Sequence, residues 1–401
     1  MEVKSVTCVA PVNIAVIKYW GKTNEKLIIP LNDSLSGTLH TDHMCAKTTV
    51  AISSRFTKDR IWLNGKEESL DNPRLVACIT EVKDRARNSG KLTEEELQWN
   101  VHICSENNFR LAAGSSVIGR LVYSLSSFFL LSVFFSVYAL ATLYKIDGDI
   151  SAIARRGSGS ACRSIYGGFV QWITGTNPNG TDSIAEQIVP ASHWPEMRVL
   201  ILVVSDSRKK ISSTSGMQRS CETSELLKHR VAKCVPERMT EITKAILKKD
   251  FETFAKITMQ DSNQFHAVGL DTFPPCVYMN DVSHGIANLI HTINRIAGRT
   301  LAAYTYDAGP NACLYLLEKD VPSVLAAVNY FFPTDRPKGE YYRGLNVDVT
   351  SVPKELAEVK DLAQWPDNNA LRYIIHTKIG EGPQIVSETL LNSDGLPKRL
   401  A

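Results

Sequence analysis

Runs of apolar, β-branched residues alternate along the chain with stretches in which apolar residues recur at helical spacing. The first third is mainly strand-like, with candidate strands at Val6 to Ile17, Lys47 to Ser53, Arg60 to Leu63 and Trp99 to Cys104. Asn64-Gly65 follows the third run and is typical of a tight hairpin turn. A helical pattern covers about Pro73 to Ala86. This mixture favours an α/β or α+β fold over a helical bundle or a β-sandwich.

The second half contains the most apolar candidate strand and the most regular candidate helix. Val199 to Val204 is an uninterrupted apolar run of buried-strand length. A helix is predicted to start near Asn280 and Asp281 and to stop at Gly298, because the apolar residues between them fall on one face. Three more candidate strands follow, at Leu301 to Tyr306, Ala312 to Leu317 and Tyr373 to Ile379.

The composition mainly excludes classes of protein and of binding partner. The chain has 401 residues, of which 44% are hydrophobic and 22% charged, so disordered, collagen-like and low-complexity classes are excluded. A net charge of +3 is too small to argue for binding to nucleic acid or to an anionic membrane. The length fits two domains or one large α/β unit. The polar segment near Pro190 to Pro195 is the best boundary, and it divides residues 1–193 from residues 194–401.

The cysteines and the first residues indicate a reducing compartment. The chain has 9 cysteines, an odd number, and they form no Cys-x-x-Cys pair. That pattern predicts reduced thiols. Charges at Glu2 and Lys4 and interruptions at Pro11 and Asn13 are not typical of a secretory signal. We therefore expect a cytoplasmic (cytosolic) protein.

Four segments concentrate small residues, hydroxyls and basic side chains beside predicted element ends, where free backbone N–H groups can hold phosphate oxygens. They are Asn13 to Lys22, Arg155 to Arg163, Lys209 to Met217 and Tyr304 to Asn311. Lys18 and Lys22 offer point charges, Arg163 can grip a carboxylate or phosphate through two parallel bonds, and Asp307 ends an apolar strand. Each segment alone also fits a plain strand end, basic loop, helix cap or turn. Together they indicate a site for a substrate that carries phosphates.

Other candidate chemistry is weaker. His40 and His43 lie close in sequence, but no partner spacing supports a zinc site, so we interpret them as ordinary polar residues. We interpret His266 as a helix residue near the site rather than a base. The sequence contains neither a Walker A loop nor a G-x-G-x-x-G fingerprint.

In combination these motifs resemble those of the diphosphomevalonate decarboxylases, a family of the GHMP kinase superfamily. The resemblance rests on Ala10 to Lys22, Arg155 to Ser164, Ser212 to Gln218, Asp261 to His266, Asp271 to Pro275 and Tyr304 to Ala312. It covers nearly the whole chain in order. It implies an α+β GHMP kinase fold of two lobes with the active site in the cleft between them. Residues 1–193 would form the nucleotide and substrate lobe, and residues 194–401 the lobe that carries the catalytic aspartate.

The resemblance also implies a reaction of the mevalonate pathway. The family takes (R)-5-diphosphomevalonate and ATP with Mg²⁺, phosphorylates the tertiary 3-hydroxyl, and releases phosphate and CO₂ to form isopentenyl diphosphate. A homodimer is implied as well. The two alternatives are a GHMP kinase that phosphorylates without decarboxylation and a catalytically impaired chain that only binds the substrate.

By this resemblance individual residues acquire expected roles. Asp307 is expected to accept or orient the proton of the 3-hydroxyl, Arg163 to hold the substrate carboxylate, and Lys18 to stabilise developing phosphate charge. Asn13 fits a supporting hydrogen-bond role. Further expected substrate contacts are Tyr19, Trp20, Gly21, Lys22, Arg74, Ser158, Gly159, Ser160, Ala161, Cys162, Ser213 and Thr214.

One segment departs from the family pattern. At the expected ATP phosphate loop Arg110 replaces a proline, and Gly114, Ser115 and Ser116 remain as the candidates for holding ATP phosphates. An uncharged run from Leu121 to Tyr144 follows, between Arg120 and Lys145. Three interpretations stay open: a buried helix behind a divergent loop, an alternative or mis-spliced exon that damages the loop, and a transmembrane helix, which the length alone would allow.

Overall fold

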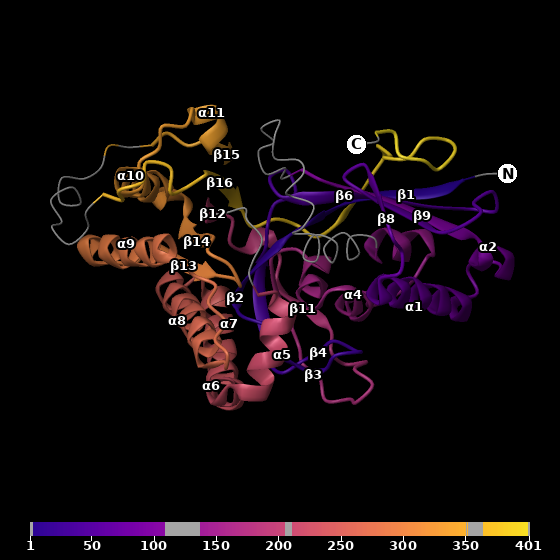
Figure 1. The fold of residues 1–401 in the computed structure, drawn as a ribbon, viewed down its shortest axis with the longest axis horizontal. Coiled ribbons are helices and arrows are strands. Elements are labelled where there is room, and N and C mark those ends of the chain that lie inside the picture. Colours follow the sequence, from indigo (N-terminus) through magenta and orange to yellow (C-terminus); the bar gives the residue numbers. More distant parts are fainter. Residues whose placement is uncertain (1–2, 109–136, 205–210, 350, 352–363, 400–401) are drawn as a thin grey trace.

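The helices and β-sheets form two lobes that lie side by side (Figure 1). This computed structural model describes residues 3–108, 137–204, 211–349, 351 and 364–399. Its mixture of mainly antiparallel sheets and packed helices is α+β, as the sequence predicts.

The first sheet has the strand order β17-β1-β6-β9-β7-β8. Its strands are β1 (Lys4–Pro11), β6 (Cys45–Ser53), β7 (Arg60–Leu63), β8 (Lys66–Glu68), β9 (Asn100–Asn107) and β17 (Gln384–Val386). The predicted hairpin joins β7 to β8, and both Asn64 and Gly65 have positive φ, as a type I′ turn requires. Helix α1 (Pro73–Ser89) starts at the capping side chain of Asn72, and the short α2 (Glu94–Gln98) precedes β9.

A second sheet of the first lobe has the order β11-β10-β5-β2. Its strands are β2 (Asn13–Ile17), β5 (Ser34–Thr38), β10 (Phe169–Trp172) and β11 (Ala185–Val189). Strands β3 (Lys22–Asn24) and β4 (Ile29–Pro30) pair separately. The predicted strand from Val6 to Ile17 is thus two strands in two sheets. Pro11 cannot donate a ladder hydrogen bond, and the chain leaves the first sheet there.

Between β9 and β10 the chain forms α4 (Ser151–Gly157) and the 3-10 helix η2 (Gly159–Ile165). Most of the uncharged run from Leu121 to Tyr144 lies outside the described residues. Its last part, residues 137–143, is helical, and Val137 and Leu140 are fully buried there. Among the helices that the structure describes, none combines the length and the apolar character that a bilayer span needs.

The second lobe is built on a sheet of order β13-β14-β12-β16-β15. Its strands are β12 (Met197–Val203), β13 (Ala302–Tyr306), β14 (Ala312–Leu317), β15 (Tyr342–Gly344) and β16 (Tyr373–Lys378). Its helices are α5 (Ser213–Thr223), α6 (Glu225–His229), α7 (Val235–Lys248), α8 (Phe251–Asp271), α9 (Asp281–Ala297), α10 (Val321–Phe331) and α11 (Lys338–Tyr341). The predicted helix is α9, capped by Asn280 and ended by left-handed Gly298.

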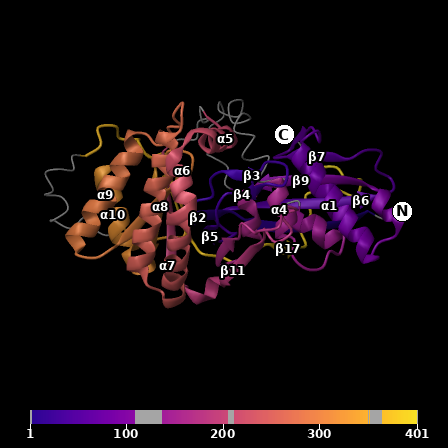
Figure 2. The same cartoon turned by 90° about the horizontal axis from the view of Figure 1, so that it is seen from below.

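Helix α8 contacts both lobes. It packs against β13 of the second lobe and against β2 of the first, and Figure 2 shows α7 and α8 beside β2, with α9 on the far side of α8. The chain also crosses back at its end, because β17 pairs antiparallel with β1. The division between residues 193 and 194 stays a prediction, and the segment around β17 belongs to the first sheet although it follows that point.

Candidate active site

A cavity of about 290 Å³ lies where β2 and η2 of the first lobe meet α5, α8 and the end of β13. It is lined by Asn13, Ala15, Lys18, Tyr19, Trp20, Lys22, Ile28, Arg74, Ser158, Gly159, Ser160, Arg163, Ser213, Thr214, Met217, Phe265, Asp307 and Ala308. All four sequence segments with phosphate-binding character therefore contribute to one cavity. Lys209 and Lys210 of the third segment lie outside the described residues.

Lys18 and Asp307 face each other across the junction of the lobes. Lys18 follows the end of β2 and is 3% exposed, while the Asp307 side chain at the end of β13 is 60% exposed. The Lys18 ammonium donates hydrogen bonds to Asp307 Oδ1 at 2.7 Å and to Ala15 O at 2.8 Å. A buried ammonium thus holds one oxygen of an open carboxylate. The arrangement suits a carboxylate that orients a substrate hydroxyl.

Arg163 supplies a buried positive charge. Its guanidinium, 1% exposed, donates from Nε to Ser36 Oγ at 2.9 Å, from Nη1 to Ser34 Oγ and from Nη2 to Asn13 Oδ1 at 3.3 Å. No ion pair to Arg163 is found among the described residues. Burial lowers the pKa of Arg163, although arginine stays charged in proteins. An uncompensated buried cation at a cavity wall favours an anionic ligand.

Asn13 ties β2 to η2. Its Nδ2 donates to Ser160 O at 3.1 Å and to Ser164 Oγ at 2.7 Å, so the oxygen of the same amide remains for Arg163. Packing demands glycine at position 159, where a Cβ would lie 2.9 Å from the Trp172 ring. The missing side chain therefore lets the start of η2 pack closely against the Trp172 and Tyr19 rings.

The Tyr19 to Lys22 segment supplies both a polar wall and an anchor. The buried Tyr19 hydroxyl has no hydrogen-bond partner among the residues that the structure describes, and it borders the cavity. Trp20 is anchored by a hydrogen bond from Nε1 to Ser220 Oγ at 2.9 Å and by edge contact with Phe265. Lys22 pairs with Glu25 at 2.7 Å. The segment thus offers the cavity one phenol and one basic group.

Two helix starts also border the cavity. Ser213 and Thr214 are the first residues of α5 after the cap Ser212, whose hydroxyl accepts from Ser215 N–H. Arg74 lies in the first turn of α1. Backbone N–H groups in a first helical turn lack partners within the helix and attract anions. These elements add to the positive potential that Lys18, Lys22 and Arg163 create.

Three of the expected contacts do not line the cavity. Gly21 turns the chain with φ near 88°, and Ala161 and Cys162 are buried behind the η2 backbone. Burial raises the pKa of the Cys162 thiol to about 12, so it is protonated at neutral pH. These residues shape the backbone around the cavity rather than its surface.

Sequence reasoning missed the apolar wall of the cavity. Its members are Ala15, Ile28, Met217, Phe265 and Ala308. Single apolar residues carry no chemical motif, and the only available signal was their position beside Lys18, Thr214, His266 and Asp307. A mixed wall of this kind excludes water from the reacting part of a ligand while the charged groups hold its ends.

The remaining candidates lie apart or outside. Gly114, Ser115 and Ser116 lie outside the described residues. The His40 and His43 rings are 5.4 Å apart, and nowhere in the described part of the chain do three or more His, Cys, Asp or Glu side chains form a group that could hold a metal. His266 lies on α8, and burial and the nearby Lys18 lower its pKa to about 4, so its imidazole is neutral.

Two α+β lobes that enclose a cavity with several cations and one carboxylate define a GHMP-type enzyme fold. Residues 10–185 match the family model of the diphosphomevalonate decarboxylase-like N-terminal domain, and residues 199–386 match that of the mevalonate 5-diphosphate decarboxylase C-terminal domain. The chain therefore belongs to the diphosphomevalonate decarboxylase family.

Individual relatives agree with this assignment. Diphosphomevalonate decarboxylase of Bos taurus is 50% identical over 404 residues, which cover 99% of this chain and 98% of that protein. The structure of mevalonate diphosphate decarboxylase from Trypanosoma brucei is similar with a TM-score of 0.86 and 36% identity, over 97% of this chain and 100% of that one. A second structure, MDDEF in complex with MVAPP, AMPPCP and magnesium, has a TM-score of 0.69 and 27% identity, over 96% of this chain and 100% of that one.

Proposed function

We propose that this chain catalyses the ATP-dependent decarboxylation of (R)-5-diphosphomevalonate to isopentenyl diphosphate, with ADP, phosphate and CO₂ as the other products. The observation that carries the proposal is the cavity in which the open Asp307 carboxylate, held by Lys18, lies on the same surface as the buried Arg163. In a substrate with a hydroxyl, a carboxylate and a diphosphate, the hydroxyl matches Asp307, the carboxylate matches Arg163, and the diphosphate matches the polar side of the cavity.

The chemistry follows from the substrate. A tertiary hydroxide leaves badly, whereas a phosphate leaves well. Asp307 accepts or orients the proton of the 3-hydroxyl, so that this oxygen can take a phosphoryl group. When the C3–O bond breaks and phosphate leaves, positive charge develops at C3. The electron pair of the bond between C2 and the carboxylate then forms the double bond, and CO₂ departs.

The charged residues act on opposite ends of this step. Arg163 holds the substrate carboxylate. Asn13 Oδ1 accepts a hydrogen bond from Arg163 Nη2 and so supports the orientation of the guanidinium. Lys18 holds Asp307 and stabilises phosphate charge as it develops. Because Arg163 is locked by Ser34, Ser36 and Asn13, it can orient the departing carboxylate without reorganisation.

The diphosphate is assigned to the more polar side of the cavity. Its proposed contacts are Tyr19, Lys22, Arg74, Ser158, Gly159, Ser160, Ser213 and Thr214, which all line the cavity, with Trp20 as a supporting wall. Gly21, Ala161 and Cys162 are assigned to the backbone behind them. Free N–H groups at the start of α5 suit the negative charge.

ATP and Mg²⁺ are proposed as the second substrate and its metal. The related structure with MVAPP, AMPPCP and magnesium supports this, and the positive wall of the cavity fits a polyphosphate ligand. Bound ATP supplies the γ-phosphoryl group, and Mg²⁺ neutralises phosphate charge. The proposed ATP contacts, Gly114, Ser115 and Ser116, lie outside the described residues.

We infer a cytosolic location and a homodimer for the chain. All nine cysteines are free in the structure, and seven are buried, in agreement with a reducing compartment. The dimer rests on the family alone, and sedimentation equilibrium tests it.

Two measurements on the purified chain test the proposed function. A coupled assay detects isopentenyl diphosphate, and calorimetric titration measures binding of diphosphomevalonate and of ATP separately. We expect product formation and binding of both ligands. ADP formation without isopentenyl diphosphate would instead identify a kinase. Substrate binding without ATP binding would identify an impaired chain that only holds its substrate.

A further inference from the structure

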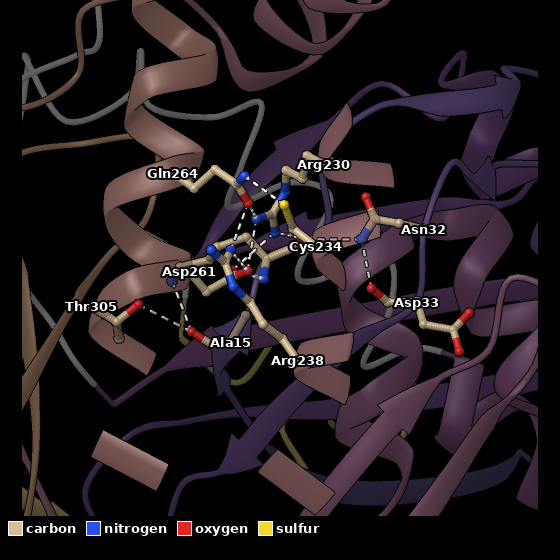
Figure 3. Close-up of polar contacts among 10 residues, drawn as sticks. Ala15, Asn32, Asp33, Arg230, Cys234, Arg238, Asp261, Gln264 and Thr305 are labelled. Atoms are coloured by element: carbon tan, nitrogen blue, oxygen red, sulfur yellow. Dashed lines mark hydrogen bonds and ion pairs between the residues drawn. The ribbon is translucent and has the colours of Figure 1, made fainter. Parts of the chain in front are cut away.

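A buried carboxylate that the proposed chemistry does not use lies directly behind Lys18. Asp261 on α8 is 0% exposed, and it is part of the motif from Asp261 to His266. Arg230 donates to it from Nη1 at 2.7 Å and from Nη2 at 2.9 Å, and Arg238 donates at 3.1 Å. Figure 3 shows both guanidinium groups directed at this carboxylate. The fourth donor is the backbone N–H of Lys18 at 2.8 Å.

The same cluster also holds the other side of the Lys18 peptide. Arg230 Nη2 donates to Lys18 O at 3.1 Å, and Asn32 Nδ2 donates to the same oxygen at 3.2 Å. Lys18 lies just beyond β2, which is an edge strand with an irregular register near Ala15 and Ile17. Sheet hydrogen bonds therefore do not fix the Lys18 backbone. Asp261, Arg230 and Asn32 replace them.

The local backbone conformation directs the Arg230 side chain toward Asp261 and the Lys18 backbone. Arg230 is the first residue of a π-helical turn, η4 (Arg230–Cys234), between α6 and α7. π-helical turns of this kind are rare and are frequently found at functional sites. The Arg230 side chain is 0% exposed and forms a bidentate pair with Asp261, whereas Arg238 is 18% exposed and reaches only Asp261 Oδ1 and Gln264. Arg230 is thus the inner partner.

We propose that the Arg230–Asp261 pair is a positioning device for Lys18, which acts through the Lys18 backbone on the ammonium that holds Asp307. This proposal rests on the proposed function of Asp307 and Lys18. A rigid clamp on both peptide groups keeps Lys18 Nζ at 2.7 Å from Asp307 Oδ1. Small displacements of catalytic groups cost large factors in rate, since reacting geometry tolerates little error. The clamp serves turnover rather than substrate affinity.

The test is Arg230→Lys, which keeps the positive charge beside Asp261. A single ammonium nitrogen cannot reproduce the guanidinium fork, in which Nη1 bonds Asp261 Oδ1 while Nη2 bonds Asp261 Oδ2 and Lys18 O. We expect kcat to fall by about ten-fold or more, with the KM for diphosphomevalonate changed by less than about two-fold. Arg299→Lys is the matched control, because Arg299 forms a bidentate pair with Asp320 away from the cavity. It should leave kcat unchanged.

Repeating Arg230→Lys in a Lys18→Gln background distinguishes an effect through Lys18 from a general effect on the fold. If Arg230 acts through Lys18, Arg230→Lys produces no further loss of kcat there. An equal fold-loss in both backgrounds, or a normal kcat in folded Arg230→Lys protein, would overturn the proposal. Should Arg230→Lys not fold, Asn32→Ala provides the same comparison, because it removes the other donor to Lys18 O together with the Asn32 hydrogen bond to Asp33 O. Absence of turnover in the unaltered chain would instead contradict the proposed function, so the two failures are distinct.

Discussion

Lys18 and Asp307 form the most informative contact in the molecule. Lysine is buried and aspartate is open, so the pair presents its carboxylate to the cavity while its cation is withdrawn from solvent. An exposed ion pair contributes little to stability, but this one is half-buried and joins the two lobes. In the proposed chemistry, the pair fixes how the Asp307 carboxylate is presented to the substrate.

The first prediction concerns the Asp307 carboxylate. Asp307→Asn keeps the shape of the side chain but removes the negative charge and the proton acceptor. We expect diphosphomevalonate to bind within about three-fold of the unaltered affinity, while turnover falls by about 10²-fold or more. Calorimetric titration and the isopentenyl diphosphate assay measure the two quantities. Near-normal turnover of the purified variant would refute the role of Asp307.

A second prediction concerns the buried imidazole of His266. Its pKa is lowered to about 4, mainly by burial and next by Lys18, from a value of 6.5 in the open chain. As pH falls below about 6.5 the unfolded chain therefore binds a proton before the folded chain does. The stability contribution of neutral His266 is complete above that pH and is lost progressively toward pH 4.

Urea unfolding of the unaltered chain and of His266→Gln at about pH 7, 5.5 and 4.5 checks this. Because glutamine does not titrate, the variant should gain stability relative to the unaltered chain as pH falls. The matched control is the same substitution at the exposed His229. A stability difference for His266→Gln that stays constant across this range would contradict a buried, neutral imidazole.

Among single residues, the sequence indicated charged and hydroxyl side chains that line the cavity, but it did not indicate which residues they contact. Lys18, Arg163 and Asp307 could be named because their types and neighbours suggest anion chemistry, and all three line the cavity. The Arg230–Asp261 pair could not, because a buried ion pair depends on which of many charges the fold brings together. Nothing in the local sequence of Arg230 marks it as the partner of a residue on another helix.

Among the elements, α5 best illustrates how packing places functional groups. Its Gly216 lies against Trp20, and a Cβ there would stand 2.2 Å from the Tyr278 hydroxyl and 3.2 Å from the Trp20 ring. The helix can therefore lie close enough to the Trp20 segment to bring Ser213 and Thr214 to the cavity. The glycine serves close approach, since its helical backbone needs no unusual φ.

A third prediction follows for Gly216→Ala. The methyl group must displace Tyr278 or move α5, so we expect a loss of about 1–3 kcal/mol in the free energy of unfolding. Displacement of Ser213 and Thr214 should also raise the KM for diphosphomevalonate. Denaturant unfolding and steady-state kinetics measure the two effects. Gly339→Ala, where nothing lies within 4 Å, is the control; equal stability and KM in both variants would contradict this packing argument.

The elements themselves were largely predictable. Helix α9 has the caps and the apolar face that the sequence indicates, and β12 coincides closely with its predicted apolar run. The exception was the run from Val6 to Ile17, whose apolar pattern is continuous although its strands separate after Pro11. The spacing of apolar residues indicates which residues are buried, but it does not indicate which sheet each strand joins.

For the whole molecule, the return of the chain end to the first sheet was not predictable from local pattern. Strand β17 pairs with β1, and beyond it Leu391 is 3% exposed in a cluster with Phe56, Trp62 and Cys104. Gly395 O accepts a hydrogen bond from His102 Nδ1 at 2.7 Å. The segment is short and mostly polar, so its pairing depends on an open strand edge far away in sequence.

The fourth prediction tests how firmly this segment is attached. Leu391→Ala removes apolar contacts in a small buried cluster, and we expect a loss of about 2–3 kcal/mol in the free energy of unfolding. Leu396→Ala is the matched control in the same segment, because Leu396 is 38% exposed and should change stability by less than about 0.5 kcal/mol. Urea unfolding compares them. Equal effects would mean that the segment contributes no core.

The pairing of β17 with β1 also sets an order of events during protein synthesis. The ribosome makes β1 before β17, so the edge of β1 that contacts Gln384 to Val386 stays open until those residues have been made. Open strand edges recruit other strands and promote aggregation. A chain that stops before residue 384 keeps this edge exposed, whereas a chain that includes β17 covers it. A chain without β17 therefore presents an aggregation-prone edge on the first sheet.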